Sequence, residues 1–124
     1  MKIKQGGKQM TQEELIKLAK EIRKDVLKKL DFKLKHRINF EYIPINGRIL
    51  GQAHCTYKKY NVYLYQTLIS YNNITYDEVI EVIKHEIAHV IDYDIHGHFT
   101  GHRKAFKDLC EKLYDDRTIG NRTL

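Results

Sequence analysis

The segment 76–95 limits the possible folds of this chain more than any other part of the sequence. Its apolar residues recur at the three- and four-residue spacing of an α-helix, which predicts a helix over about 76–95. These apolar positions are Val79, Ile80, Ile83, Ile87, Val90 and Ile91. Thr75 and Glu78 have the spacing of a capping box, and Gly97 is well placed to end the helix. Because apolar residues cover most of its circumference, this helix is expected at the centre of the fold.

Two more helices are predicted, one near each end of the chain. Thr11 and Glu14 form a second capping-box pattern, and the apolar spacing after them predicts a helix over about 12–30. Apolar residues that recur from Phe106 onward predict a third helix over about 101–115, with Thr100 as a possible cap.

Residues 37–65 favour β-structure. Ile38, Phe40 and Tyr42 alternate with polar residues, which is the period of a half-buried strand. Two further strands are predicted over about 48–57 and 62–65, and Gly51 indicates a close approach by a neighbouring backbone. Asn46-Gly47 is typical of a tight hairpin turn, so the three strands are expected to form an antiparallel meander. The expected fold class is α+β.

A chain of 124 residues has room for one domain, which we place at 11–115 between a flexible lead-in (1–10) and a polar tail (116–124). No apolar run is long enough to cross a bilayer, and no apolar stretch follows the basic start as in a secretory signal. We therefore expect a cytoplasmic protein without membrane contact. Cys55 and Cys110 stand too far apart in the sequence for a cysteine-built zinc ribbon and are expected to be reduced.

The central helix carries the sequence His-Glu-Ile-Ala-His at 85–89. His85 and His89 are four residues apart, so their rings face the same side of the helix and can bind one tetrahedral zinc ion. Glu86 lies about 100° further round, where it can reach a water on the metal and act as a general base. The alternative is a surface helix with two solvated histidines. The apolar neighbours disfavour it, because buried imidazoles and a buried carboxylate need partners.

A catalytic zinc ion usually has three protein ligands and one position left for water. The candidates for the third ligand are His96, His98, His102, Asp108 and Glu111. His102 is favoured because it shares the inward face of the predicted third helix with apolar residues. The glycine-containing turn before it lets that helix fold back. His96 and His98 lie within the turn itself and are expected to be solvated.

The segment HEIAHVIDYDIHGHFTGHRKAF resembles the SprT-like family, which includes the Spartan proteases. The residues that carry the resemblance are His85, Glu86, His89, Gly101, His102 and Phe106. The segments ILGQAHCTY and NVYLYQTL are similar to the family's sheet, so the resemblance covers about residues 11–115. The chain differs at Arg103, where the family often has glycine, and it has no zinc ribbon.

The resemblance implies a zincin-like fold that holds one catalytic Zn²⁺ through His85, His89 and His102, with Glu86 as base. It implies a zinc-dependent endopeptidase that hydrolyses peptide bonds with a zinc-activated water. Spartan-type members cleave proteins crosslinked to DNA, which makes DNA-associated proteins a candidate substrate. Tyr93 is a candidate for stabilising the oxyanion, and Asp92 for orienting a ligand.

The chain has a net charge of +6, and a basic surface attracts polyanions. One face of the predicted first helix is basic through Lys17, Lys20, Arg23, Lys24 and Lys28. A generally lysine-rich surface would give the same charge, so DNA stays one possible partner beside a protein or peptide substrate. Two other functions remain open at this point. One is a DNA-binding or scaffold domain with a structural zinc and no catalysis, and the other is a site-specific protease that acts on a regulator protein.

Overall fold

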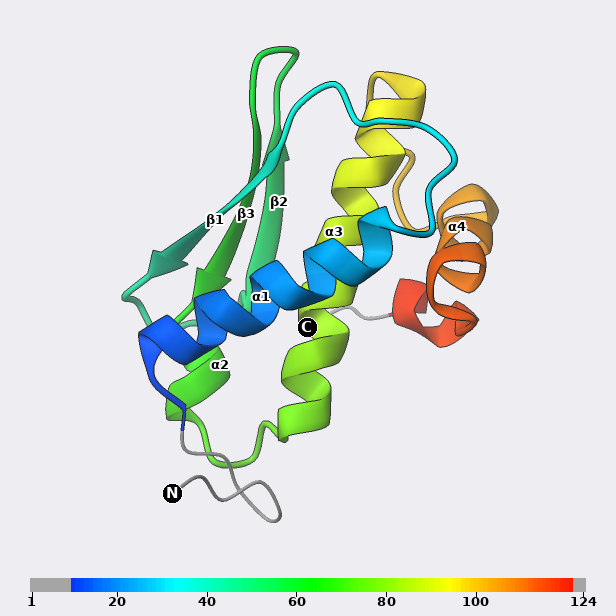
Figure 1. Cartoon of the computed structure of the whole chain (residues 1–124). Helices are drawn as coiled ribbons and strands as arrows, with labels where there is room; N and C mark the ends of the chain where they lie inside the picture. Colours follow the sequence, from blue (N-terminus) through cyan, green and yellow to red (C-terminus); the bar gives the residue numbers. More distant parts are fainter. Residues whose placement is uncertain (1–9, 122–124) are drawn as a thin grey trace.

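The computed structural model describes residues 10–121, which form four α-helices, one 3-10 helix and one three-stranded sheet (Figure 1). The predicted α+β class is therefore confirmed, while residues 1–9 of the predicted lead-in and 122–124 of the tail lie outside the described residues. In chain order the elements are α1 (Gln12–Leu27), β1 (Ile38–Ile43), β2 (Gly51–Cys55), β3 (Tyr60–Tyr65), α2 (Thr67–Ser70), α3 (Tyr76–His96), α4 (Lys104–Tyr114) and the 3-10 helix η1 (Arg117–Asn121).

The sheet is mixed, so the predicted antiparallel meander is wrong. The strand order is β1-β3-β2, with β1 parallel to β3 and β2 antiparallel to it. Asn46-Gly47 does not form a tight hairpin, because both residues bind the segment that follows β3. The Gly47 N–H donates to Thr67 Oγ1 at 2.8 Å, and Ser70 Oγ donates to Asn46 Oδ1 at 2.7 Å. The loop thus passes the end of β3 and delivers β2 to its far side.

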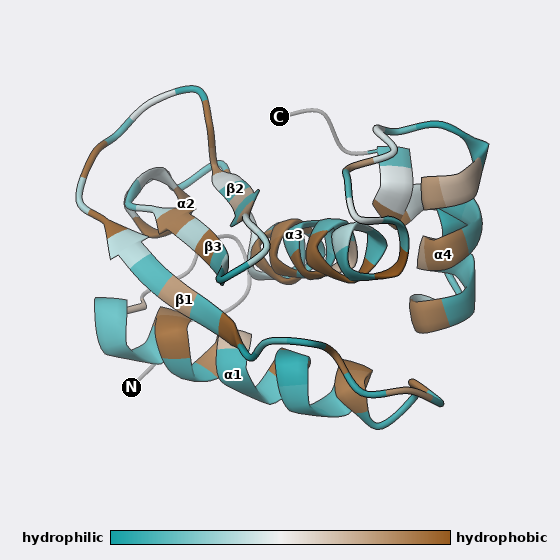
Figure 2. Ribbon diagram, turned by 90° about the horizontal axis from the view of Figure 1, so that it is seen from above, coloured by the Kyte–Doolittle hydropathy of each residue, from teal (hydrophilic) through white to brown (hydrophobic). Residues whose placement is uncertain are grey.

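The helix α3 lies at the centre of the described structure, as its apolar circumference predicted. Figure 2 shows α3 between the sheet and α4, with α1 alongside. The two predicted capping boxes, at Thr11 and Thr75, are both present. The apolar side of α1 faces this core through Leu15, Ala19, Ile22 and Val26, all buried. A fixed central helix gives the side chains that it carries a rigid base.

The C-terminal end differs from the sequence prediction. A left-handed residue, Asp115 (φ 56°), ends α4, and the chain then forms η1 instead of fraying. Ile119 is 3% exposed and Gly120 is buried, so part of the predicted polar tail belongs to the core. A single apolar residue in a polar stretch gives too short a pattern to predict this.

Neither cysteine forms a disulfide, and neither thiol is a ready metal ligand. Burial raises the pKa of Cys55 to about 12 and that of Cys110 to about 12, so both stay protonated at neutral pH. None of the helices within residues 10–121 has the length and apolar composition that crossing a bilayer requires.

Candidate metal centre

Three residues of the site come from two successive turns of α3. His85 is 5% exposed and Glu86 is 8% exposed, while His89 is half-buried. The four-residue spacing of the two histidines places their Nε2 atoms 3.0 Å apart. Since α3 is packed on several sides, these rings have little freedom to move apart.

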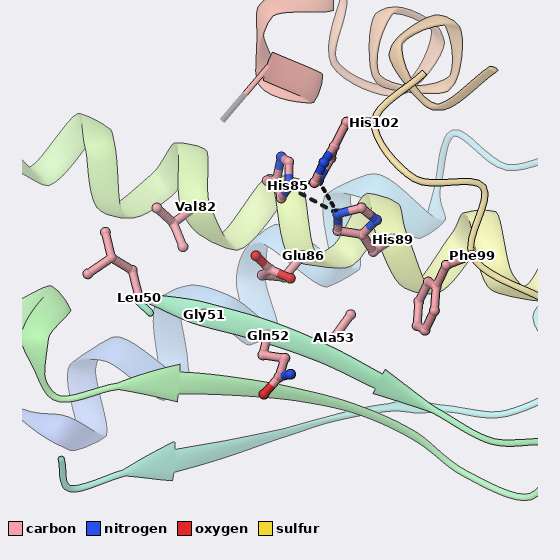
Figure 3. A pocket seen from close by; sticks show the side chains of 10 residues that line it. All are labelled: Leu50, Gly51, Gln52, Ala53, Val82, His85, Glu86, His89, Phe99 and His102. Atoms are coloured by element: carbon pink, nitrogen blue, oxygen red, sulfur yellow. Dashed lines mark hydrogen bonds between the residues drawn. The ribbon is translucent and has the colours of Figure 1, made fainter. Parts of the chain in front are cut away.

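The third imidazole, His102, reaches the site from the loop between α3 and α4. Gly97 (φ 78°) and Gly101 (φ 81°) turn this loop in the left-handed region, which favours glycine. Nε2 of His102 lies 3.0 Å from Nε2 of His89 and 3.2 Å from Nε2 of His85 (Figure 3). His102 therefore precedes α4 rather than lying on its inward face.

The loop that carries His102 is fastened to α3 by Asp92. This carboxylate is 0% exposed and accepts two hydrogen bonds from Thr100, one from its N–H at 2.7 Å and one from Oγ1 at 2.9 Å. Nδ1 of His96 lies 3.0 Å from Asp92 Oδ1, the oxygen that also accepts from Thr100 Oγ1. Asp92 thus fastens the loop to α3 at a point two residues before His102.

Contacts outside the triangle orient the rings. Nδ1 of His85 donates to the carbonyl oxygen of Ile119 at 2.7 Å. A carbonyl oxygen only accepts, so the neutral His85 ring carries its proton on Nδ1 and has a lone pair on Nε2. The His89 ring stacks on Phe106, with centroids 4.1 Å apart. His89 Nδ1 is buried and has no hydrogen-bond partner among the described residues.

The donor set suits a divalent metal ion. The three Nε2 atoms lie 3.0–3.2 Å apart. Nitrogens bound to one tetrahedral zinc ion lie about 3.3 Å apart, given zinc–nitrogen bonds of about 2.0–2.1 Å. Burial, with further contributions from His85 and His102, lowers the pKa of His89 to about 3. The ring is therefore neutral at pH 7, as a metal ligand must be. His85, His89 and His102 could thus hold one metal ion.

Glu86 lies beside the three histidines and faces β2 (Figure 3). The backbone N–H of Ala53 donates to its carboxylate, yet burial outweighs this bond and raises the pKa of Glu86 to about 7. A Cβ on Gly51 would lie 3.0 Å from Glu86 Cγ and 3.1 Å from Val82 Cγ1. The close approach that Gly51 indicated is thus made by side chains of α3.

A pocket of about 270 Å³ opens over the histidines and Glu86, between α3 and β2. Leu50 and Val82 line one end, and Phe99 lines the other (Figure 3). β2 is an edge strand of the sheet. The histidines and the carboxyl group therefore lie beside a strand edge, in a hollow with apolar ends.

The other candidate residues lie elsewhere. His96 is held by Asp92, and His98 Nδ1 donates to the carbonyl oxygen of Phe99 on the exposed side of the loop. Tyr93 packs against Tyr60 and Phe99 and does not line the pocket.

The two candidate acids of α4 pair with cations and do not line the pocket. Asp108 binds Lys104 and Arg117, and Glu111 lies 3.5 Å from Arg117. Sequence reasoning missed the Ile119 carbonyl and the Ala53 N–H. Both are backbone groups, and residue types do not reveal them.

The fold and site define an α+β protein with a three-histidine metal-binding arrangement and an adjacent glutamate. A model of the SprT-like family matches residues 4–122, nearly the whole chain. The chain therefore belongs to the SprT-like family, and the resemblance predicted from the sequence is confirmed. It matches no curated protein and no solved structure.

Proposed function

We propose that this protein is a zinc-dependent endopeptidase with a zincin-like active site. His85, His89 and His102 hold the ion, and Glu86 is the general base. The observation that carries the proposal is the convergence of three Nε2 atoms within 3.2 Å of one another, next to a buried carboxyl group. Membership of the SprT-like family, generally a family of zinc metalloprotease-like proteins, supports the same function.

The chemistry divides between the ion and the chain. When bound, zinc supplies Lewis-acid polarisation of a water and of a peptide carbonyl. Glu86, with a pKa of about 7, takes a proton from the attacking water and passes it to the leaving amine. The Ala53 N–H of β2 favours the ionised form of this carboxyl group, so β2 contributes to the environment of the base. Cleavage requires Glu86 to be ionised before the attack.

The position of β2 favours an extended peptide as substrate. An edge strand offers main-chain groups to an added strand, and here it runs along the pocket. Leu50 and Val82 at one end and Phe99 at the other offer apolar contacts to substrate side chains. We propose that the protein cleaves unfolded or extended segments, and that it does so in the cytoplasm.

Metal content and peptidase activity test the proposal together. Purified wild type is expected to hold one zinc ion per chain and to cleave an unfolded substrate such as casein. His102→Ala is expected to lose metal, whereas His98→Ala, a histidine of the same loop outside the site, keeps it. Glu86→Gln is expected to keep metal and lose at least about 100-fold in rate. Equal metal loss in the two histidine variants would contradict the ligand assignment.

A second candidate is a nucleic-acid-binding or scaffold domain whose metal is structural. A shallow groove along α1 favours it. Beside Glu21 and Leu27, its lining holds six cationic side chains, namely Lys17, Lys20, Arg23, Lys24, Lys28 and Arg37. The groove shares no residue with the metal pocket. Normal function in Glu86→Gln, with a site that has no exchangeable water, would support this candidate over the peptidase.

The basic groove also makes DNA-associated proteins a proposed substrate class. The double variant Lys17→Glu/Lys24→Glu is expected to bind single-stranded DNA more weakly than wild type, and its binding should depend less on salt concentration. The control variant Lys104→Glu/Lys112→Glu, on α4, should show smaller changes in both affinity and salt dependence. Histone or casein cleavage should rise when single-stranded DNA is added to wild type. Cleavage that is indifferent to DNA would instead favour a protease specific for a regulator protein.

A further inference from the structure

The carbonyl oxygen of Ile119 accepts a hydrogen bond from His85 Nδ1, and it lies outside α3 and its loops. It belongs to η1, which follows the left-handed turn at Asp115. The bond is buried and 2.7 Å long, and it joins residues 34 positions apart in the sequence. A ligand ring is therefore oriented by the part of the chain that comes last in the described structure.

Several contacts hold η1 in place against α4. Asp116 Oδ1 accepts from the N–H of Thr118 at 2.9 Å, which shapes the turn that leads into Ile119. Arg117 binds Asp108 on the outer face of α4. The side chain of Ile119 is buried in the core. These contacts limit the movement of η1 and therefore of the Ile119 carbonyl.

Gly120 sets how closely η1 approaches α4. A Cβ at this position would lie 3.0 Å from Lys107 Cγ, 3.2 Å from Lys107 Cα and 3.5 Å from Cys110 Sγ. The contact with a backbone Cα cannot be relieved by a side-chain rotation. An added Cβ therefore requires η1 and α4 to separate by a few tenths of an ångström, which shifts the adjacent Ile119 carbonyl.

We infer that η1 is a positioning element of the metal centre. Its Ile119 carbonyl selects the tautomer of His85 that presents a lone pair on Nε2. Gly120 sets the distance between η1 and α4 and thereby the position of this carbonyl. This inference rests on the proposed metal site. Outer partners of ligand histidines fix the ring orientation and raise the basicity of the ligand. The C-terminal segment thus acts on the site without contacting substrate.

The matched pair Gly120→Ala and Gly47→Ala tests the inference. Gly47 has no atom within 4 Å of an added Cβ, so its alanine variant controls for the loss of a glycine. Zn²⁺ affinity, measured by chelator competition well below each unfolding temperature, is expected to fall about 10- to 100-fold in Gly120→Ala and to stay unchanged in Gly47→Ala. The absorption spectrum of bound Co²⁺ should change only in Gly120→Ala. Wild-type affinity in a folded Gly120→Ala protein would overturn the inference.

A second measurement needs neither metal nor a stable variant. In the metal-free wild type at pH 8, long-range ¹H–¹⁵N NMR spectra are expected to show His85 protonated at Nδ1. Protonation at Nε2 would overturn the inference even if Gly120→Ala failed to fold. If wild type bound neither Zn²⁺ nor Co²⁺, the proposed metal site would be wrong, and the NMR result would still decide whether Ile119 selects the His85 tautomer.

Discussion

The carboxyl group of Glu86 lies where the protein disfavours its charge. Burial raises its pKa from 4.5 to about 7, although the Ala53 N–H stabilises the charged form. His89 is shifted in the opposite direction, to about 3, mainly by burial. Both shifts favour the uncharged form of the group in the metal-free protein, and a bound cation would favour the ionised Glu86 carboxylate and the unprotonated His89 ring.

These shifts predict how the metal-free protein responds to pH. Below pH 4.5 the burial of the Glu86 charge does not lower the free energy of unfolding, because the carboxyl group is protonated in both the folded and the unfolded state. The cost of this burial grows as the pH rises to about 7, because only the unfolded state then loses the proton. Glu86→Gln should therefore be more stable than wild type at pH 8, by up to about 3 kcal/mol, with little difference near pH 4.5. Urea unfolding with chelator at several pH values measures this difference.

Comparing wild type with Glu86→Gln separates the effect of Glu86 on stability from that of His89. The depressed pKa of His89 contributes stability above pH 6.5 that is lost as the pH falls toward 3, and it does so in both proteins. A stability difference that does not change between pH 5 and pH 8 would contradict the buried, charge-disfavouring environment of Glu86.

The sequence could predict those site residues whose relative positions follow from the geometry of a single helix. His85, Glu86 and His89 lie within five residues of one helix, so their mutual arrangement is local. His102 was favoured for its place on a helix, whereas it lies in the loop before α4. The Ile119 carbonyl could not be predicted, because it depends on a turn at Asp115 and on tertiary packing.

Among the elements, the loop between α3 and α4 depends on Asp92. Its carboxylate is fully buried and accepts from both the N–H and the Oγ1 of Thr100. Glycines at 97 and 101, both with a positive φ, flank the segment that Thr100 fastens. The position of His102 should therefore respond to changes at Thr100.

Thr100→Val removes one of these two bonds and keeps the shape of the side chain. It is expected to destabilise the protein by about 1.5–3 kcal/mol, the range for a hydrogen bond to a charged group, and to weaken zinc binding. Thr56→Val, at an exposed turn, should change neither by a comparable amount. Thermal unfolding and chelator competition give the two quantities. An unchanged zinc affinity in Thr100→Val would show that Asp92 does not position His102.

The spacing between β2 and α3 depends on Gly51. In Gly51→Ala the new Cβ meets Glu86 Cγ and Val82 Cγ1 at 3.0 and 3.1 Å, so the strand or the base must move. We expect a loss of about 1–3 kcal/mol in stability and a larger relative loss in kcat than in metal content. Peptidase kinetics on metal-loaded protein check this, and full activity would show that Glu86 tolerates displacement.

The arrangement of the strands was harder to predict than their existence. Alternation in Ile38–Ile43 identifies a half-buried strand, but it fits parallel and antiparallel partners equally. Asn46-Gly47 favoured a hairpin, yet Thr67 and Ser70 bind this dipeptide from beyond the sheet. Such partners are distant in sequence, so a local turn signal cannot include them.

On the scale of the whole molecule, the apolar core extends well beyond the three histidines. Buried apolar residues run from Leu15 in α1 through the sheet and α3 to Phe106 in α4 and Ile119 in η1. The site lies at one border of this core, with His102 exposed to solvent. We therefore expect the protein to fold without metal, unlike small zinc modules whose folding free energy comes from metal binding.

Removal of metal is expected to lower the unfolding temperature but to leave the fold intact. Circular dichroism with EDTA should keep its helical signal at 25 °C, because the core remains buried. Zinc at 1,000 times its dissociation constant should restore about 4 kcal/mol. A cooperative loss of helix on adding EDTA would show instead that metal binding and folding are inseparable here.

The central position of β3, the last strand in sequence, has a consequence for folding kinetics. β2 and β3 are joined by a short turn, whereas β1 must pair in parallel with a strand beyond residue 59. Closing the shorter loop costs less entropy, so the β2–β3 pair should form early and β1 should dock late. Truncations in the early pair, such as Val62→Ala, should mainly slow refolding, whereas Phe40→Leu in β1 should mainly accelerate unfolding.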